Sequence, residues 1–271
     1  KNHFRIISSA ATRERDKFHI KKHLSDGIEL HDVTDDYCVF GIFGPKSRYL
    51  MQEICKDDFT NQNFKFGHSK NIQVDNLKIW TQRLSYVGEL GYELYVKVSD
   101  AKKIYELLID KGKKFNLSNC GMHALDTMRM ESGFLHWGHD ISPEENQYQS
   151  GLKFTLSNKK QFDFIGKEAL SRIKQKKVDR IFAMFTLKNN KPGMPLMLHD
   201  EPIYLKDQII GRTTSGNYSF NFKKNLAFGY IKNYLSNKEL SNSEIYIEIE
   251  KNKYQAEILL KPLKKSNFKN I

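Results

Sequence analysis

Cysteine is scarce in this sequence: Cys38, Cys55 and Cys120 are the only three in 271 residues, widely spaced and without a CxxC pair. An odd number of distant cysteines is neither a disulfide framework nor a zinc site. We therefore expect three packing thiols, no metal, and a reducing, cytoplasmic setting.

Long apolar runs are missing too. No window approaches the ~18 consecutive apolar residues of a membrane span, and the opening KNHFRIISSA lacks the apolar core of a secretory signal. We expect no membrane partner. The chain begins with Lys, inside a strand-like pattern. We interpret it as a piece of a longer protein whose N-terminal part is missing.

Positive charge, in contrast, is abundant, with a formal net charge of +12. The lysines are scattered along the whole chain, and no basic strip with interleaved aromatics follows an RNA-binding signature. We expect no nucleic-acid partner. A small polyanionic ligand fits the charge equally well.

Helical and strand-like patterns alternate over the first two thirds of the chain, which predicts an α+β architecture. The turn pair Asp75-Asn76 and the helix stop Gly133 punctuate it. Predicted helices cover 13–25, 99–111, 121–133 and 164–176, with one more opened by GPKSRYLMQEIC; predicted strands cover 4–9, 28–33, 37–42, 71–75, 77–84 and 91–97.

Only strand-like segments follow from about residue 177, which predicts a small β-barrel or sandwich. The segments are RIFAMFTL, IYLKDQIIGRTTS, LAFGYI, EIYIEIE and KYQAEILL. We therefore expect one domain over 1–176, incomplete at its N-terminus, and a β-barrel domain over 177–271.

The stretch SYVGELGYELYV, residues 85–96, places carboxylates in an apolar, aromatic segment. In a strand over 91–97, Glu93 shares a face with Gly91, which would leave space beside the carboxylate. A carboxylate there can accept two N–H bonds from one edge of a planar heterocycle. Tyr86 is suited to stack on or hydrogen-bond the same ring. A solvated Glu93, or one paired with Lys or Arg, is the alternative.

Four stretches in order resemble the glycine-cleavage T-protein (aminomethyltransferase) superfamily, most nearly the C-terminal tetrahydrofolate domain of dimethylglycine and sarcosine dehydrogenases. The resemblance covers essentially the whole chain and implies a folate-binding domain over 1–176 followed by the C-terminal barrel. The stretches are SYVGELGYELYV, GMHALDTMRMESGFLHWGHDISPEE, QFDFIGKEAL and GRTTSGNYSFNFKKNLAFGYI.

The resemblance implies that tetrahydrofolate takes up a one-carbon unit from a small methylated amine and becomes 5,10-methylenetetrahydrofolate. Tyr86 and Glu93 match the family's pterin-contacting tyrosine and glutamate. Phe134 falls where an aromatic lines the folate site, with core packing as the alternative. A dinucleotide fingerprint is absent, so FAD would belong to an upstream oxidoreductase domain or subunit.

Other positions match the family or depart from it. For Arg129, Glu131 and Asp140 we expect a buried Arg–Glu or Arg–Asp pair that holds two elements together. The family's catalytic aspartate would precede residue 1, so we expect no catalytic residue in this chain. Leu125 replaces an arginine of the glycine-cleavage enzyme, which favours the dehydrogenase branch, and Gln149 replaces a frequent glutamate.

Two other functions remain open. One is a non-catalytic relic that docks to a partner subunit of a heteromeric oxidase. The other is a folate-dependent demethylase of another methylated substrate, because fold analogy alone does not decide the substrate. The KGCYxGQE motif of the related tRNA-modification folate protein is absent.

Overall fold

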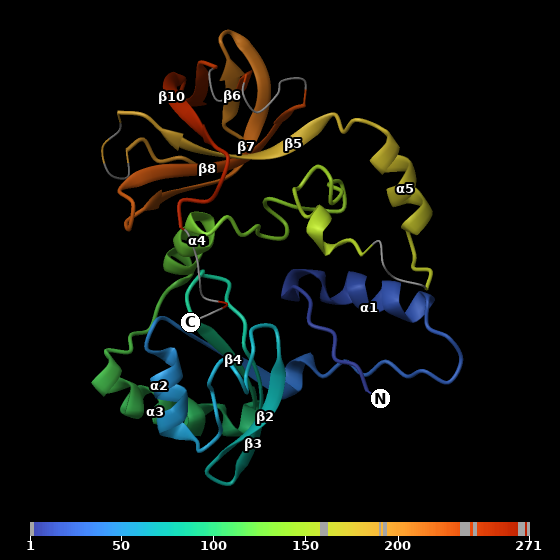
Figure 1. Cartoon of the computed structure of the whole chain (residues 1–271), viewed down its shortest axis with the longest axis vertical. Helices are drawn as coiled ribbons and strands as arrows, with labels where there is room; N and C mark the ends of the chain where they lie inside the picture. The colour runs from blue at the N-terminus through green and yellow to red at the C-terminus, as the bar shows by residue number, and fades with distance from the viewer. Residues whose placement is uncertain are drawn as a thin grey trace. The chain divides into compact units, whose positions relative to one another are not determined.

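The computed structural model describes residues 3–157, 162–189, 191, 194–233, 239–240, 243–264 and 269. It confirms the α+β architecture (Figure 1). The chain separates into two compact units, unit 1 formed by 1–84 and 91–118, and unit 2 formed by 85–90 and 119–271. Each unit is described by itself, and the stretch SYVGELGYELYV contributes to both.

Unit 1 contains a four-stranded antiparallel sheet in the order β1-β4-β3-β2. Val74 pairs with Leu77 across a two-residue turn, and Asp75 adopts a φ of +50°. The predicted tight turn at Asp75-Asn76 is therefore confirmed. The strands are β1 (Tyr37–Phe43), β2 (Ser69–Val74), β3 (Leu77–Gln82) and β4 (Gly91–Lys97).

Two helices, α2 (Ser47–Ile54) and α3 (Ala101–Gly112), pack against each other and against β4. Their apolar stripes and one face of the sheet form the core of unit 1, because strand side chains alternate between faces. The opposite face of the sheet carries polar and aromatic groups. Core residues on the covered face and the helices include Leu50, Met51, Ile54, Ile72, Val74, Ile79, Leu94, Val96, Ile104 and Leu108.

The predicted strands over 4–9 and 28–33 are wrong, since neither segment pairs with a strand among the described residues. The helix predicted over 13–25 is α1 (Arg13–Lys22), and it buries no side chain; Phe18 is 70% exposed. Polar contacts link this helix to the following segment: Arg13 donates to both Asp32 and Asp35. In the segments 4–9 and 28–33, the alternation of apolar residues is therefore not sufficient to form a strand.

Unit 2 contains a closed barrel, ordered β10-β5-β8-β7-β6-β9, and so a barrel and not a sandwich. Helix α4 (Met122–Glu131) packs on β7 and β8, and Gly133, with φ +73°, follows its end as predicted. The other elements are β5 (Arg180–Leu187), β6 (Pro202–Leu205), β7 (Gln208–Ser219), β8 (Lys224–Lys232), β9 (Ile245–Ile249), β10 (Asn252–Leu259) and α5 (Lys167–Gln175).

The barrel is filled by aliphatic side chains with one central aromatic, Phe185, which is fully buried. Helix α5 ends at Gln175 and β5 begins at Arg180. The boundary expected near residue 177 falls in this connection and stays a prediction. No helix in the described part of the chain is long and apolar enough to cross a membrane.

Candidate functional site

Glu93 lies in the middle of β4, between the buried side chains of Tyr92 and Leu94. Alternation therefore directs it to the sheet face that α2 and α3 do not cover. The hydroxyl of Tyr95 donates to Glu93 Oε2 at 2.8 Å. Among the described residues no Lys or Arg forms an ion pair with this carboxylate, and its hydrogen-bond partner in unit 1 is the neutral phenol of Tyr95.

Tyr95 is the residue of this site that sequence reasoning does not single out. Burial first, and then the hydrogen bond to Glu93, raises the pKa of Tyr95 above its usual range. The phenol therefore stays protonated and remains a donor to the carboxylate at physiological pH. Strand alternation is the signal that could have found it, because residues 93 and 95 lie on one face.

The space expected beside Glu93 is filled. The ring of Phe43 lies over Gly91 and also over Gly41, the partner of Glu93 in the β1–β4 register. A Cβ at either glycine would lie inside van der Waals contact with that ring. These glycines thus accommodate Phe43, and the prediction that Gly91 leaves open space is wrong.

Tyr86 and Phe134, both in unit 2, are brought together. Their rings stack with centroids 6.2 Å apart and an interplanar angle of 16°. The Tyr86 hydroxyl donates to the carbonyl oxygen of Leu135 at 2.9 Å, and burial raises the pKa of Tyr86 to about 12. Tyr86 is therefore neutral, and its hydroxyl is already oriented by the protein. Glu93, the third residue predicted to contact folate, belongs to unit 1.

The loop over 85–90 is held against the end of α4. Gly88 adopts a φ of +67°, and a Cβ there would overlap the Ser132 side chain. Gly88 therefore combines a positive φ with a close approach to a neighbouring side chain, and both favour glycine at this position. Glu89 forms an ion pair with Lys264. The two carboxylates of SYVGELGYELYV therefore differ: Glu89 is paired with a cation and Glu93 with a phenol.

A buried ion pair joins α4 to the following loop, as expected for Arg129. Arg129 Nη1 donates to Asp140 Oδ2 at 2.5 Å, and the two side chains are 1% and 0% exposed. Asp140 also accepts from the backbone N–H of His136 and from the hydroxyls of Thr214 and Ser215 on β7. The pair therefore also ties the loop to the barrel.

The alternative Arg129–Glu131 pair is wrong. The carboxylate of Glu131, 0% exposed, accepts instead from Ser219 Oγ and Asn221 Nδ2, each at 2.7 Å. Arg129 and Glu131, in the last turn of α4, thus contact the barrel through separate polar groups, because residues two positions apart point in different directions on a helix.

Gln149 has a defined role in unit 2. Its Oε1 accepts from the backbone and side chain of Asn146 at 3.0 and 2.8 Å, and its Nε2 donates to Asp179 Oδ1 at 2.8 Å. A glutamate at this position would keep the acceptor but lose the donor. The amide of Gln149 therefore supplies a donor to Asp179 that a glutamate could not supply.

Gln149→Glu is expected to destabilise unit 2 by about 1 kcal/mol at neutral pH, a value reduced because Asp179 is exposed. The hydrogen bond from Gln149 is the main cause that lowers the pKa of Asp179. The stabilisation that this hydrogen bond gives to the folded state is present above the unfolded pKa of Asp, and it is lost as the pH falls through the folded pKa of Asp179. In the variant, two facing carboxylates raise each other's pKa instead.

The destabilisation should therefore shrink on acidification, as the carboxylate pair takes up a proton. Urea unfolding of wild type and Gln149→Glu at pH 7 and near pH 4.5 measures this. Gln208→Glu, an exposed position of the same unit, is the control. An equal penalty at both pH values would contradict the assigned contact.

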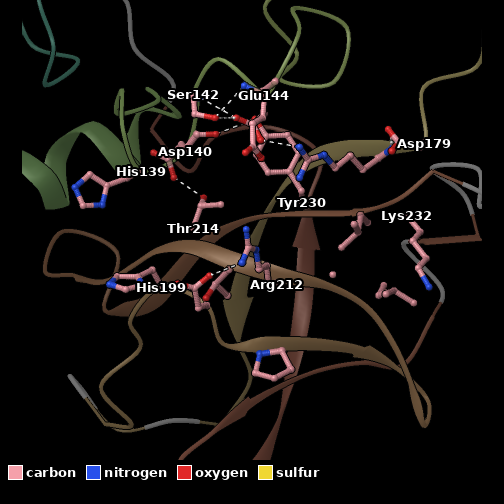
Figure 2. Close-up of a pocket in the computed structure, with 18 of the residues that line it drawn as sticks. His139, Asp140, Ser142, Glu144, Asp179, His199, Arg212, Thr214, Tyr230 and Lys232 are labelled. Atoms are coloured by element: carbon pink, nitrogen blue, oxygen red, sulfur yellow. Dashed lines mark hydrogen bonds and ion pairs between the residues drawn. The ribbon is translucent and has the colours of Figure 1, made fainter. Parts of the chain in front are cut away.

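Unit 2 also contains a cleft of about 1340 Å³, lined by the loop over 138–145 and by strands of the barrel (Figure 2). Two of its acidic residues form ion pairs: Glu145 accepts from Arg180 at 2.8 Å, and Asp200 contacts His199 at 2.8 Å and Arg212 at 3.1 Å. None of the three residues predicted to contact folate lines this cleft.

Comparison with known proteins identifies the class to which this fold and these residues belong. The family model described as "GCVT N-terminal domain" matches residues 1–160, and the one described as "Glycine cleavage T-protein C-terminal barrel domain" matches residues 180–265. The chain therefore belongs to the glycine cleavage T-protein (aminomethyltransferase) family.

Similar curated proteins include the mitochondrial dimethylglycine dehydrogenase of Homo sapiens, 31% identical over 96% of this chain and 30% of that protein. The aminomethyltransferase of Alkaliphilus metalliredigens (strain QYMF) is 29% identical over 99% of this chain and 71% of its own length. The chain thus spans less than a third of the dimethylglycine dehydrogenase it matches.

The fold has a solved counterpart in the glycine cleavage system aminomethyltransferase T from Bartonella henselae. The TM-score is 0.79 at 19% identity, over 95% of this chain and 67% of that one. This likeness supports the fold alone.

Proposed function

We propose that this chain is the tetrahydrofolate-binding, one-carbon-accepting part of an N-methyl amine dehydrogenase or aminomethyltransferase that forms 5,10-methylenetetrahydrofolate. The observation that carries the proposal is the Glu93 carboxylate, held by the neutral hydroxyl of Tyr95 on the uncovered face of the sheet, in a chain of the T-protein family. Relatives named dimethylglycine dehydrogenase and aminomethyltransferase support this choice of substrate class.

The residues fit a pterin. In the described part of unit 1, Tyr95 occupies Oε2 of Glu93, while Oε1 has no donor. The N–H edge of a pterin is a complementary donor for that carboxylate. In unit 2, the stacked rings of Tyr86 and Phe134 offer an aromatic surface of the kind on which a flat ligand ring packs. Bound tetrahydrofolate would supply N5 and N10, which accept the one-carbon unit.

This chain's own residues would bind and orient the ligand. Glu93 would fix the pterin by its N–H edge, and Tyr95 would hold the carboxylate in one rotamer. We assign no catalytic residue within the chain. A small methylated amine, and an upstream FAD-dependent domain or subunit that oxidises it, are parts of the same proposal.

Calorimetric titration of the chain with tetrahydrofolate tests the proposal. Glu93→Ala should weaken binding by about 2–3 kcal/mol, roughly a hundredfold, because a charged acceptor is lost. Glu93→Gln keeps the shape but not the charge and should recover only part of the affinity.

Glu106→Ala, which removes an exposed carboxylate from α3, is the control and should bind like wild type. Wild-type affinity in Glu93→Ala, or a folded wild-type chain that binds no tetrahydrofolate, would contradict the proposal.

A further inference from the structure

The same face of unit 1 carries a cation on an aromatic platform. The guanidinium carbon of Arg5 lies 4.2 Å from the ring centroid of Trp80 and 5.5 Å from that of Tyr37. Trp80 in turn packs against Tyr95, with centroids 4.5 Å apart. Stacking on aromatic rings holds a guanidinium in place while its N–H groups remain free to bind.

The charge of Arg5 is not compensated within the described residues. Nearby cations have carboxylate partners: Arg13 and Lys17 both pair with Asp32. No carboxylate in the described chain forms an ion pair or hydrogen bond with Arg5, which stacks on the two rings. A planar cation without an acid partner is suited to bidentate binding of an external carboxylate.

Arg5 also lines two hollows. Cavities of about 300 and 390 Å³ share Arg5, Tyr37 and Tyr95 in their walls. Space therefore adjoins the guanidinium on the same face as the hydroxyl that holds Glu93. An anion can reach Arg5 without displacing a protein partner.

A chain of side-chain contacts links Glu93 to Arg5 on this face of the sheet. The path from Glu93 runs over Tyr95 and then Trp80 to the guanidinium, a span of two aromatic side chains. Folate has the same order of groups: an N–H edge on the pterin, two ring systems, and carboxylates at the far end. We propose that Arg5 is an anion subsite for the glutamate tail of folate, an inference that rests on the proposed function.

The experiment compares two ligands, tetrahydrofolate and 6-methyltetrahydropterin, which lacks the tail. Arg5→Ala should weaken tetrahydrofolate binding about tenfold, the size expected for a charged hydrogen bond. The affinity of the Arg5→Ala variant for the tetrahydropterin should change less than about twofold, a limit set by the loss of one screened positive charge. Both affinities are measured by calorimetry on the whole chain.

Two further variants sharpen the result. Arg5→Lys keeps the charge but not the planar fork, and should recover only part of the preference for the tail. Lys102→Ala removes one positive charge from an 88% exposed side chain on α3 and should leave both affinities unchanged. The wild-type preference for the tailed ligand should fall as ionic strength rises.

Each outcome decides the inference. If Arg5→Ala weakens both ligands equally, or neither, Arg5 only fastens the N-terminal segment to the sheet and the inference is overturned. If Glu93→Ala abolishes binding while Arg5→Ala keeps the tail preference, the inference fails and the proposed function stands. A folded wild-type chain that binds neither ligand overturns both.

Discussion

Asp140→Ala is expected to destabilise unit 2 by about 3–5 kcal/mol, because it leaves the guanidinium of Arg129 buried without its main partner. Arg129 is 1% exposed and cannot turn to water. The contact of Arg129 Nε with Asp126 Oδ1, at 2.7 Å, would persist in the variant. The hydroxyls of Thr214 and Ser215 would lose an acceptor as well.

The measurement is urea unfolding followed by tryptophan fluorescence. The chain has two tryptophans, Trp80 in unit 1 and Trp137 in unit 2, so a Trp80→Phe background reports on unit 2 alone. Asp200→Ala, which removes an exposed carboxylate paired with His199 and Arg212, should cost less than about 1 kcal/mol. Similar losses in both variants would contradict the role given to the buried pair.

The barrel could be predicted from the sequence because its segments are short, rich in apolar residues and separated by turn residues, with no helical pattern between them. Lys206, with φ +54°, lies in the turn between β6 and β7. The segments over 4–9 and 28–33 have similar composition but no partner strand. Pairing depends on residues far along the chain, and a local pattern does not contain that information.

In the candidate site, too, some features follow from the local sequence and others depend on tertiary packing. The face on which Glu93 lies follows from alternation along β4, a local property. The ring of Phe43 over Gly91, and the choice of Asp140 as the partner of Arg129, depend on tertiary packing. The bond between Gln149 and Asp179 joins residues thirty positions apart in sequence. No spacing rule along the chain predicts contacts of this kind.

Gly211→Ala is expected to destabilise the barrel by about 3 kcal/mol or more, because β7 and β8 approach too closely there for a side chain. A Cβ at Gly211 would overlap the carbonyl group of Tyr230 and lie 3.0 Å from Ile231 Cα. Strand β8 cannot move aside, since it is also paired with β5. Gly121→Ala is the control. A Cβ at Gly121 would meet no atom within 4 Å, and its φ of −81° suits any residue. This variant should lower the free energy of unfolding by less than about 1 kcal/mol, which is the weak preference of a helix N-cap for Gly over Ala. Urea unfolding monitored by Trp137 compares the two, and a Gly211→Ala loss as small as the control's would refute the close approach of these strands.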